Sequence, residues 1–291
     1  IELATDPQQL AVSPARFDAQ LAWLKANCQV LTADEFDEFL QSGKRFPSNS
    51  ALITFDDGYA DNHQIARPIL ERHALQGLFY IASGYIGADR EYWWDELERL
   101  LLLNPNLPKS LEYDRLDGEL NWHYDHPPNA ADMRERYGFL IATLRILSSE
   151  ARDAILSELR IRLDSSRPRS THLPMTHDEL RAFASSPSVA IGAHTIGHCT
   201  LSSRDEDGQR SEIIGSKQAL EALLNRPIVR FAYPFGTGAE FNAVSMRICE
   251  QAGFHHAAAN VTGIVHRRSP RFAFPRVIVR DWEAKEFERR L

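Results

Sequence analysis

The chain has few cysteines and no long hydrophobic run. Its three cysteines, Cys28, Cys199 and Cys249, are widely spaced, and no Cys-x-x-Cys pair occurs. This pattern excludes a disulfide framework and a thiolate metal site, because both need paired or clustered cysteines. No apolar stretch approaches the roughly 20 residues with which a helix crosses a bilayer. We therefore expect buried, apolar cysteines and no transmembrane segment.

The chain also lacks an excess of positive charge, internal repeats and low-complexity tracts. Its formal net charge is -7 and its sequence pI is about 5.9. A protein of this charge has no general attraction to nucleic acid or to an anionic membrane surface, so we expect neither as a partner. Recognition of a specific small molecule or sugar is unaffected by this argument.

What the chain does contain is enough apolar material for one large domain. Of its 291 residues, 43% are hydrophobic and 25% are charged. Such a chain can bury a sizeable core. It begins at Ile1 rather than Met and shows no signal peptide, so we expect residues 1–291 to form a single domain that is truncated at its N-terminus. The cytoplasm and the cell envelope both remain open as locations.

Short apolar runs alternate with helix-like segments, and some helices carry clear start signals. Thr32 with Glu35, and Thr176 with Glu179, have the spacing of capping boxes. Alternating strands and helices are typical of a parallel sheet covered by helices, and about seven such units predict a distorted (β/α)7-type barrel. The predicted strands are 29–31, 51–55, 78–82, 189–193, 228–232, 256–259 and 274–279.

The alternation stops between residues 89 and 174. Helix-like pieces occur there, without a convincing strand, so we expect a helical insertion of roughly 85 residues, longer than an ordinary connection. Its Trp93, Trp94, Trp122, Tyr124 and His126 could line a sugar-binding face. Packing of these rings against the rest of the protein is the stronger interpretation, and Trp94 is only a candidate substrate contact.

Three groups of polar residues follow predicted strands. Asp56 and Asp57 follow the predicted strand 51–55, and His194-Thr-Ile-Gly-His198 follows the predicted strand 189–193. The third group, Arg230-Phe-Ala-Tyr-Pro-Phe-Gly236, ends the predicted strand 228–232. In a barrel of parallel strands the carboxyl ends converge at one mouth, so these groups can meet. Two neighbouring carboxylates raise each other's pKa, which predicts a positive partner for them. Alone, Asp-Asp-Gly is equally typical of a turn.

His194 and His198 have the spacing that places two imidazoles on one face of a helical turn. With one carboxylate they would form a two-histidine, one-carboxylate site that leaves positions open for water, as in hydrolytic zinc and non-haem iron sites. A His-x-x-x-His pair alone is weak support, because two unrelated histidines give the same pattern. The Asp pair makes the metal interpretation the better one.

The three motifs together resemble the polysaccharide deacetylases, the NodB-homology or carbohydrate esterase family 4 enzymes. The matching stretches are Thr54-Phe-Asp-Asp-Gly-Tyr59, His194-Thr-x-x-His198 and Arg230-x-x-Tyr233-Pro234. The resemblance spans nearly the whole chain except the insertion. It implies a metal-dependent hydrolase that removes N-acetyl groups from amino sugars of a bacterial polysaccharide or lipid-linked glycan.

The resemblance also implies roles for single residues. Asp57, His194 and His198 would bind a divalent metal, most often Zn²⁺, with Co²⁺, Mn²⁺, Ni²⁺ or Fe²⁺ as alternatives. Asp56 would be the general base. The remaining expectations are that Arg230 is the positive partner of Asp56, that the backbone N–H of Tyr233 stabilises the oxyanion, and that Thr195 and Pro234 lie near the substrate.

The chain departs from the family at the general acid. Many members have a histidine near the end of the last strand, whereas Phe274-Pro-Arg-Val-Ile-Val-Arg-Asp281 has none. We expect the acid to lie upstream of Ile1, with His266 as the alternative within the chain. Arg276 resembles an arginine of the family that braces the site. Two other functions stay open: hydrolysis of a cyclic amide or ureide on the same barrel, and glycan binding without catalysis.

Overall fold

The protein is described here from a computed structural model, which covers residues 3, 5–112, 121–163 and 167–291. The chain divides into two compact units, each described by itself. The barrel unit contains Gln8–Ala88 and Pro174–Leu291, and the helical unit contains Leu3–Pro7 and Asp89–Leu173. Within the described residues, no helix has both the length and the apolar character that crossing a membrane requires.

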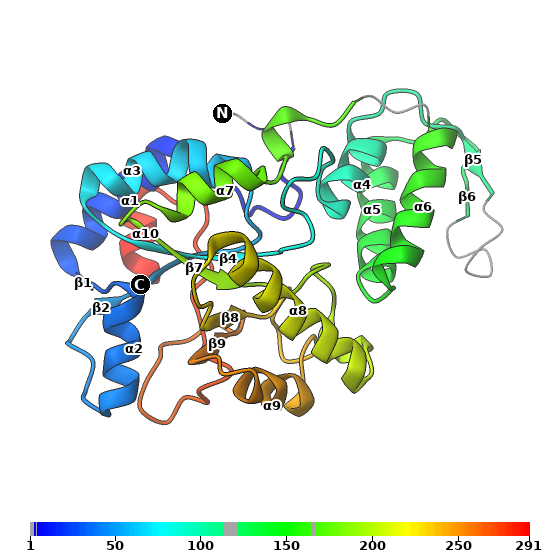
Figure 1. Cartoon of the computed structure of the whole chain (residues 1–291). Helices are drawn as coiled ribbons and strands as arrows, with labels where there is room; N and C mark the ends of the chain where they lie inside the picture. Colours follow the sequence, from blue (N-terminus) through cyan, green and yellow to red (C-terminus); the bar gives the residue numbers. More distant parts are fainter. Residues whose placement is uncertain (1–2, 4, 113–120, 164–166) are drawn as a thin grey trace. The chain divides into compact units, whose positions relative to one another are not determined.

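A five-stranded parallel sheet forms the centre of the barrel unit (Figure 1). Its strand order is β3-β4-β7-β8-β9, and every neighbouring pair is parallel. These strands are β3 (Ile53–Phe55), β4 (Gly77–Ile81), β7 (Val189–Ala193), β8 (Arg230–Ala232) and β9 (His256–Ala258). β4 and β7 are buried along their whole length, as expected for strands covered on both faces.

The sheet continues irregularly at both edges. β1 (Gln29–Val30) pairs in parallel with β2 (Ser50–Ala51), which leads directly into β3. At the other edge, Phe274 forms a parallel bridge with Ala258. Leu31 and Phe274 belong to one buried apolar cluster, so the two edges approach each other. The predicted distorted (β/α) barrel is confirmed, although the run 274–279 forms only this bridge and not a full strand.

Helices of the barrel unit connect and cover the strands. The predicted capping boxes at Thr32 and Thr176 are both present. They start α2 and α7, because each threonine hydroxyl accepts the otherwise unbonded N–H of a glutamate three residues on. The helices are α1 (Pro14–Asn27), α2 (Ala33–Ser42), the π-helix η1 (Asn62–Ala66), α3 (Arg67–His73), α7 (His177–Ala184), η4 (Leu201–Ser203), α8 (Glu206–Leu224), α9 (Ala243–Gln251) and α10 (Ala284–Arg290).

The helical unit packs its own apolar residues around three helices, α4 (Trp93–Leu102), α5 (Ala130–Leu144) and α6 (Ser149–Arg162). The short 3-10 helix η3 (Ser170–His172) follows. The expectation that no strand occurs in this stretch is wrong, because β5 (Ser110–Leu111) pairs antiparallel with β6 (Trp122–His123). Two-residue strands are too short to leave a periodic pattern in the sequence.

Candidate active site

Asp57, His194 and His198 lie together at the carboxyl ends of β3 and β7. Asp57 Oδ1 is 3.2 Å from His198 Nε2 and 3.5 Å from His194 Nε2. One ligand atom from each of the three residues lies within 4.8 Å of the others. Both histidines are buried, and the Asp57 side chain is 21% exposed. The structure therefore brings together the three residues that the motifs single out.

The three side chains have the chemistry and spacing of a divalent metal site. His194 Nδ1 lies 2.8 Å from the carbonyl oxygen of Ala232, so it donates its proton there and leaves the Nε2 lone pair facing Asp57. Metal-binding histidines are commonly oriented in this way by a bond to the other ring nitrogen. Atoms 3.2–3.5 Å apart are also spaced as ligands that share one ion through bonds of about 2.0–2.2 Å. The residues present fit Zn²⁺ or a similar ion.

The backbone around the cluster is unusual. Asp57 (φ 76°), Thr195 (φ 64°), His198 (φ 48°) and Phe235 (φ 58°) all adopt left-handed conformations that L-residues rarely occupy. Such conformations persist where the surrounding structure enforces them, and they concentrate at functional sites. At Gly58 (φ 101°) a Cβ atom would lie 3.2 Å from the Ile81 side chain, so glycine suits this turn. The turn redirects Asp57 away from the side taken by Asp56.

α8 holds the loop that carries the two histidines. Glu212 Oε2 accepts the backbone N–H groups of Ile196 and Gly197, each at 2.8 Å. The carbonyl of Thr195 accepts the N–H of Ser83, which follows β4. Glu212 was not predicted as a site residue. Nothing in the sequence distinguishes it from the other acidic residues of α8, because its partners are backbone groups of a loop.

Asp56 pairs with Arg276. Two nearly parallel contacts of 2.8 Å join the guanidinium to both carboxylate oxygens, and Arg276 also donates to the carbonyl of Ala259 at 3.1 Å. Burial alone would raise the pKa of Asp56, but the charge of Arg276, with His194 and His198, outweighs it and lowers the pKa to about 2. Asp56 is therefore ionised at neutral pH.

The expected pairing of Asp56 with Arg230 is wrong. Arg230 instead contacts Asp37 at 2.7 Å and also pairs with Asp34, both on α2. The reason is its place in the strand: Arg230 is the first residue of β8 and lies at the amino end of the sheet, whereas the cluster follows the carboxyl ends. Arg276 comes from the run beside β9 and reaches the carboxyl end.

Tyr233 is a buried anchor. Its hydroxyl donates to the carbonyl of Phe272 at 2.9 Å, and its ring stacks on Phe241 with centroids 4.1 Å apart. Its backbone N–H donates to the carbonyl of Ala258 at 3.0 Å, so it is already used and the predicted oxyanion role is wrong. Pro234 is buried beside it.

The remaining candidates differ in position. Thr195 is fully buried beside His194, and its hydroxyl has no hydrogen-bond partner among the described residues. His266 is exposed on a turn with Ser269. That turn leads to Arg271, which contacts the carbonyl of His255 at the amino end of β9, away from the metal-ligand cluster. Trp94 belongs to the helical unit and stacks on Tyr92 at 4.9 Å.

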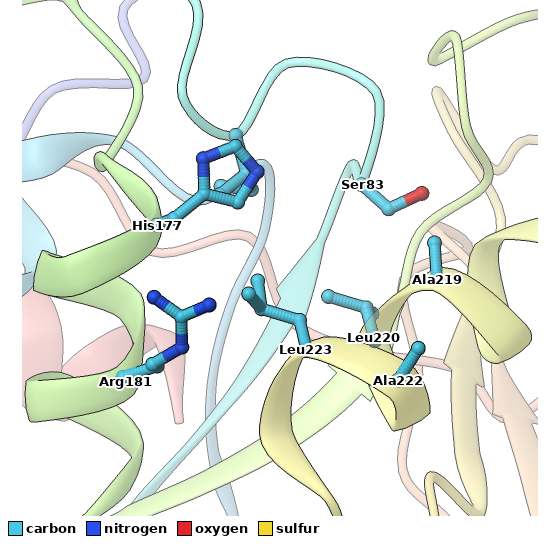
Figure 2. A pocket seen from close by; sticks show the side chains of 8 residues that line it. Ser83, His177, Arg181, Ala219, Leu220, Ala222 and Leu223 are labelled. Atoms are coloured by element: carbon cyan, nitrogen blue, oxygen red, sulfur yellow. The ribbon is translucent and has the colours of Figure 1, made fainter.

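A pocket of about 330 Å³ opens elsewhere on the barrel unit (Figure 2). Apolar side chains of α8 form one wall, and His177 and Arg181 of α7 face them. Ser83 lines it and donates its N–H to the Thr195 carbonyl, so the pocket adjoins the histidine loop. None of Asp56, Asp57, His194 or His198 lines it.

Comparison with known proteins shows which proteins the chain is similar to. The family described as polysaccharide deacetylase matches residues 147–257. YxkH of Bacillus subtilis, whose name places it provisionally among the polysaccharide deacetylases, is 21% identical over 271 residues, which are 93% of this chain and 66% of YxkH. A poly-β-1,6-N-acetyl-D-glucosamine N-deacetylase of Staphylococcus aureus is 31% identical over 90 residues, 31% of either chain. The chain thus spans less than two thirds of both relatives.

Solved structures share the fold. The Streptococcus pyogenes deacetylase PplD, in complex with acetate, aligns with a TM-score of 0.61 at 16% identity, covering 98% of this chain and 92% of PplD. IcaB from Ammonifex degensii aligns with a TM-score of 0.60 at 15% identity, covering 98% and 90%. The predicted resemblance to the polysaccharide deacetylases is confirmed: part of the chain matches the model of that family, and the fold is the one found in solved deacetylases.

Proposed function

We propose that this protein is a metal-dependent hydrolase that removes acetyl groups from N-acetylated amino sugars of a glycan. The observation that carries the proposal is the juxtaposition of the Asp57, His194 and His198 cluster with an ionised neighbour, Asp56. A carboxylate, two imidazoles and a separate ionised carboxylate are what metal-assisted hydrolysis of an amide requires.

The proposed roles follow from the contacts. Asp57, His194 and His198 would hold a divalent ion, which when bound polarises the acetyl carbonyl and lowers the pKa of water. Both carboxylate oxygens of Asp56 accept hydrogen bonds from Arg276, so the side chain is held in position and kept ionised. As the next residue to Asp57, it can accept the proton of a water molecule that attacks the acetyl carbon. The amide C–N bond then breaks while the leaving nitrogen takes up a proton from a general acid, which yields acetate and a free amine.

Hydrogen bonds from neighbouring residues hold the metal-ligand cluster in position. The Ala232 carbonyl orients His194, and Glu212 holds the N–H groups of the loop between the two histidines. The buried Thr195 hydroxyl, next to His194, is proposed to contact the acetyl group. These supports matter because a displacement of about 1 Å at reacting groups can cost a factor of about 100 in rate.

The proposed substrate class is a polymer of N-acetylglucosamine. The Staphylococcus aureus relative is named for action on poly-β-1,6-N-acetyl-D-glucosamine. Its similarity covers 31% of either chain, so it supports the class of sugar as a proposal for this protein. Cyclic amides and ureides are the substrates of the competing hydrolase function.

The test measures acetate released from β-1,6-linked N-acetylglucosamine oligomers, with cyclic ureides assayed in parallel. We expect release from the sugar, loss of release after removal of metal by a chelator, and recovery on addition of Zn²⁺ or Co²⁺. Asp57→Asn should lose both activity and recovery. Full activity in protein shown to be metal-free would refute the metal dependence, and turnover of the ureides alone would refute the sugar substrate.

A further inference from the structure

A second group of potential metal ligands lies within the helical unit. Asp95 and Glu98 lie three residues apart on α4, so they share one face of that helix, and His172 ends η3. One ligand atom from each of these residues lies within 4.8 Å of the others. Asp95 and His172 are each 8% exposed and Glu98 is 3% exposed. All three side chains are therefore buried.

Glu98 lacks a close positive partner. Its Oε2 atom accepts a long hydrogen bond of 3.4 Å from Arg169 Nη2, the other side-chain donor that interacts with Glu98 is the neutral Thr5 hydroxyl, and its Oε1 atom makes no hydrogen bond of normal geometry to the described residues. The Glu98 side chain is 4% exposed, so water compensates for little of this. A buried carboxylate oxygen without a donor is costly. This oxygen is the second, independent indication of a missing cation.

The arginines nearby are engaged by another carboxylate. Arg169 bonds Glu91 through Nε at 2.8 Å and through its backbone N–H at 2.6 Å. Arg99 contacts the same glutamate at 2.9 Å, and the Glu91 side chain is completely buried. Glu91 therefore has two close guanidinium partners, whereas Glu98 has one distant partner. Glu91 and Glu98 are both buried, yet their charges are compensated unequally.

His172 is oriented for ligation. Its Nδ1 atom lies 2.8 Å from the Thr171 hydroxyl, so a proton on Nδ1 can be donated to that oxygen and Nε2 keeps its lone pair. A neutral imidazole with one nitrogen hydrogen-bonded is the usual form of a metal ligand.

From this geometry we propose that Asp95, Glu98 and His172 bind a second divalent transition-metal ion, with Zn²⁺ as the probe that defines the site. Two carboxylates and one imidazole are ligands that such ions accept. The ion would join η3 to α4 and supply the charge that Glu98 lacks. Its effect would be structural, because ions bound only by the folded state stabilise it.

The experiment counts ions in the full chain whose first site has been removed. In Asp57→Ala/His194→Ala protein, equilibrium dialysis against Zn²⁺ followed by elemental analysis should give one ion per chain, against two in the wild type. Adding Glu98→Gln or His172→Gln to this background should reduce the number to zero. Zn²⁺ should also raise the melting temperature of the background variant, by about 4 °C or more, and should not raise that of the Glu98→Gln derivative.

The matched control is Glu158→Gln on α6, whose partly exposed glutamate pairs with Arg162 in the same unit. It should keep the ion count of the background. The background variant contains every proposed second-site ligand, so a count of zero in folded background protein overturns the proposal. An unchanged count after Glu98→Gln and after His172→Gln also overturns it. Increased stability of Glu98→Gln without any ion would show that a proton on Glu98, and not a metal, compensates the group. Failure of glycan hydrolysis would leave this count unaffected.

Discussion

Two aspartate–arginine pairs lie in the same barrel unit, one at each end of its sheet. Asp56 and Arg276 meet at the carboxyl end beside the cluster of Asp57, His194 and His198. Asp37 and Arg230 meet at the amino end, and their side chains are 6% and 9% exposed, against 31% and 16% for Asp56 and Arg276. The two pairs have the same chemistry, but only the carboxyl-end pair is next to the candidate metal ligands and partly open. Position along the strand therefore separates a catalytic candidate from a stabilising pair.

The comparison is tested most strongly at Asp56. Asp56→Asn keeps the shape of the side chain but removes the proposed base, so turnover of an N-acetylglucosamine oligomer should fall by about 10²–10⁴-fold. The melting temperature should also fall by several degrees, because the ion pair with Arg276 is lost, so turnover is compared in protein that is folded at the assay temperature. Acetate release measures the first effect and thermal unfolding the second. The exposed Asp178→Asn is the matched control, and activity that survives loss of Asp56 would remove that residue from the mechanism.

At the amino end, the expected loss is in stability. Arg230→Met leaves Asp37 buried without its closest cation, so the free energy of unfolding should fall by about 3–5 kcal/mol. Denaturant unfolding measures this loss. Replacing both residues, as Asp37→Leu/Arg230→Met, should recover part of it, because no uncompensated charge then remains. If Arg230→Met abolished the activity of protein that stayed folded, the separation of the two pairs would be wrong.

At the carboxyl end, Arg276→Met should act on rate. Without the guanidinium, burial dominates and raises the pKa of Asp56, and the carboxylate loses its fixed position, so turnover should fall by about 100-fold. The acidic limb of the pH–rate profile should move to higher pH, because the base must be ionised to act. Arg276→Lys keeps the charge but not the paired contacts, so it should restore the position of that limb more than the rate.

Particular residues show how far the sequence led to this arrangement. The capping boxes at Thr32 and Thr176 predict the starts of two helices, because their hydrogen bonds join residues close together in the sequence. The three motifs predict the residues of the metal-ligand cluster, because they follow recognisable strands. Arg276 was noted only for its resemblance, because its run forms one bridge instead of a ladder. The expected pairing of Arg230 with Asp56 is wrong, because Arg230 lies at the amino end of its strand and contacts Asp37 there. A motif next to a predicted strand does not show at which end of the sheet each of its side chains lies. The predicted oxyanion role of the Tyr233 backbone N–H is also wrong, because this group donates to the carbonyl of Ala258.

His256 makes the amino end sensitive to pH. Burial lowers its pKa to about 4, and Asp37, Arg230, His255 and Arg271 are the charged or titratable groups that act on it. Its folded pKa is below the unfolded value of about 6.5, so the unfolded state binds the proton first and stability falls as the pH drops from about 6.5 toward 4. Between pH 7 and pH 5 this one residue should cost about 2 kcal/mol.

His256→Phe should remove that slope. The ring packs 5.2 Å from Phe36 and 5.7 Å from Phe274 between centroids, so phenylalanine is a close replacement. Denaturant unfolding at pH 7 and pH 5 measures the difference, and the other histidines contribute equally to both proteins. A variant whose stability still falls as steeply as that of the wild type would show that His256 does not carry this pH dependence.

The smallest effect is expected at His266, the in-chain alternative for the general acid. Its turn is held by local bonds, from its own N–H to the Ser269 hydroxyl and from the N–H of Ser269 to its carbonyl. The neighbouring Val265 packs against the apolar cluster that includes Phe36 of α2, and α2 also carries Asp37, which pairs with Arg230 at the amino end of the sheet. His266 is therefore assigned to the side of the barrel that does not hold the metal-ligand cluster. His266→Ala should leave both kcat and the basic limb of the pH–rate profile within about twofold of the wild type, as is usual for exposed positions without a role. A fall of 100-fold or more, with the basic limb lost, would make His266 the proton donor and would require the turn to approach the opposite end of the barrel during turnover.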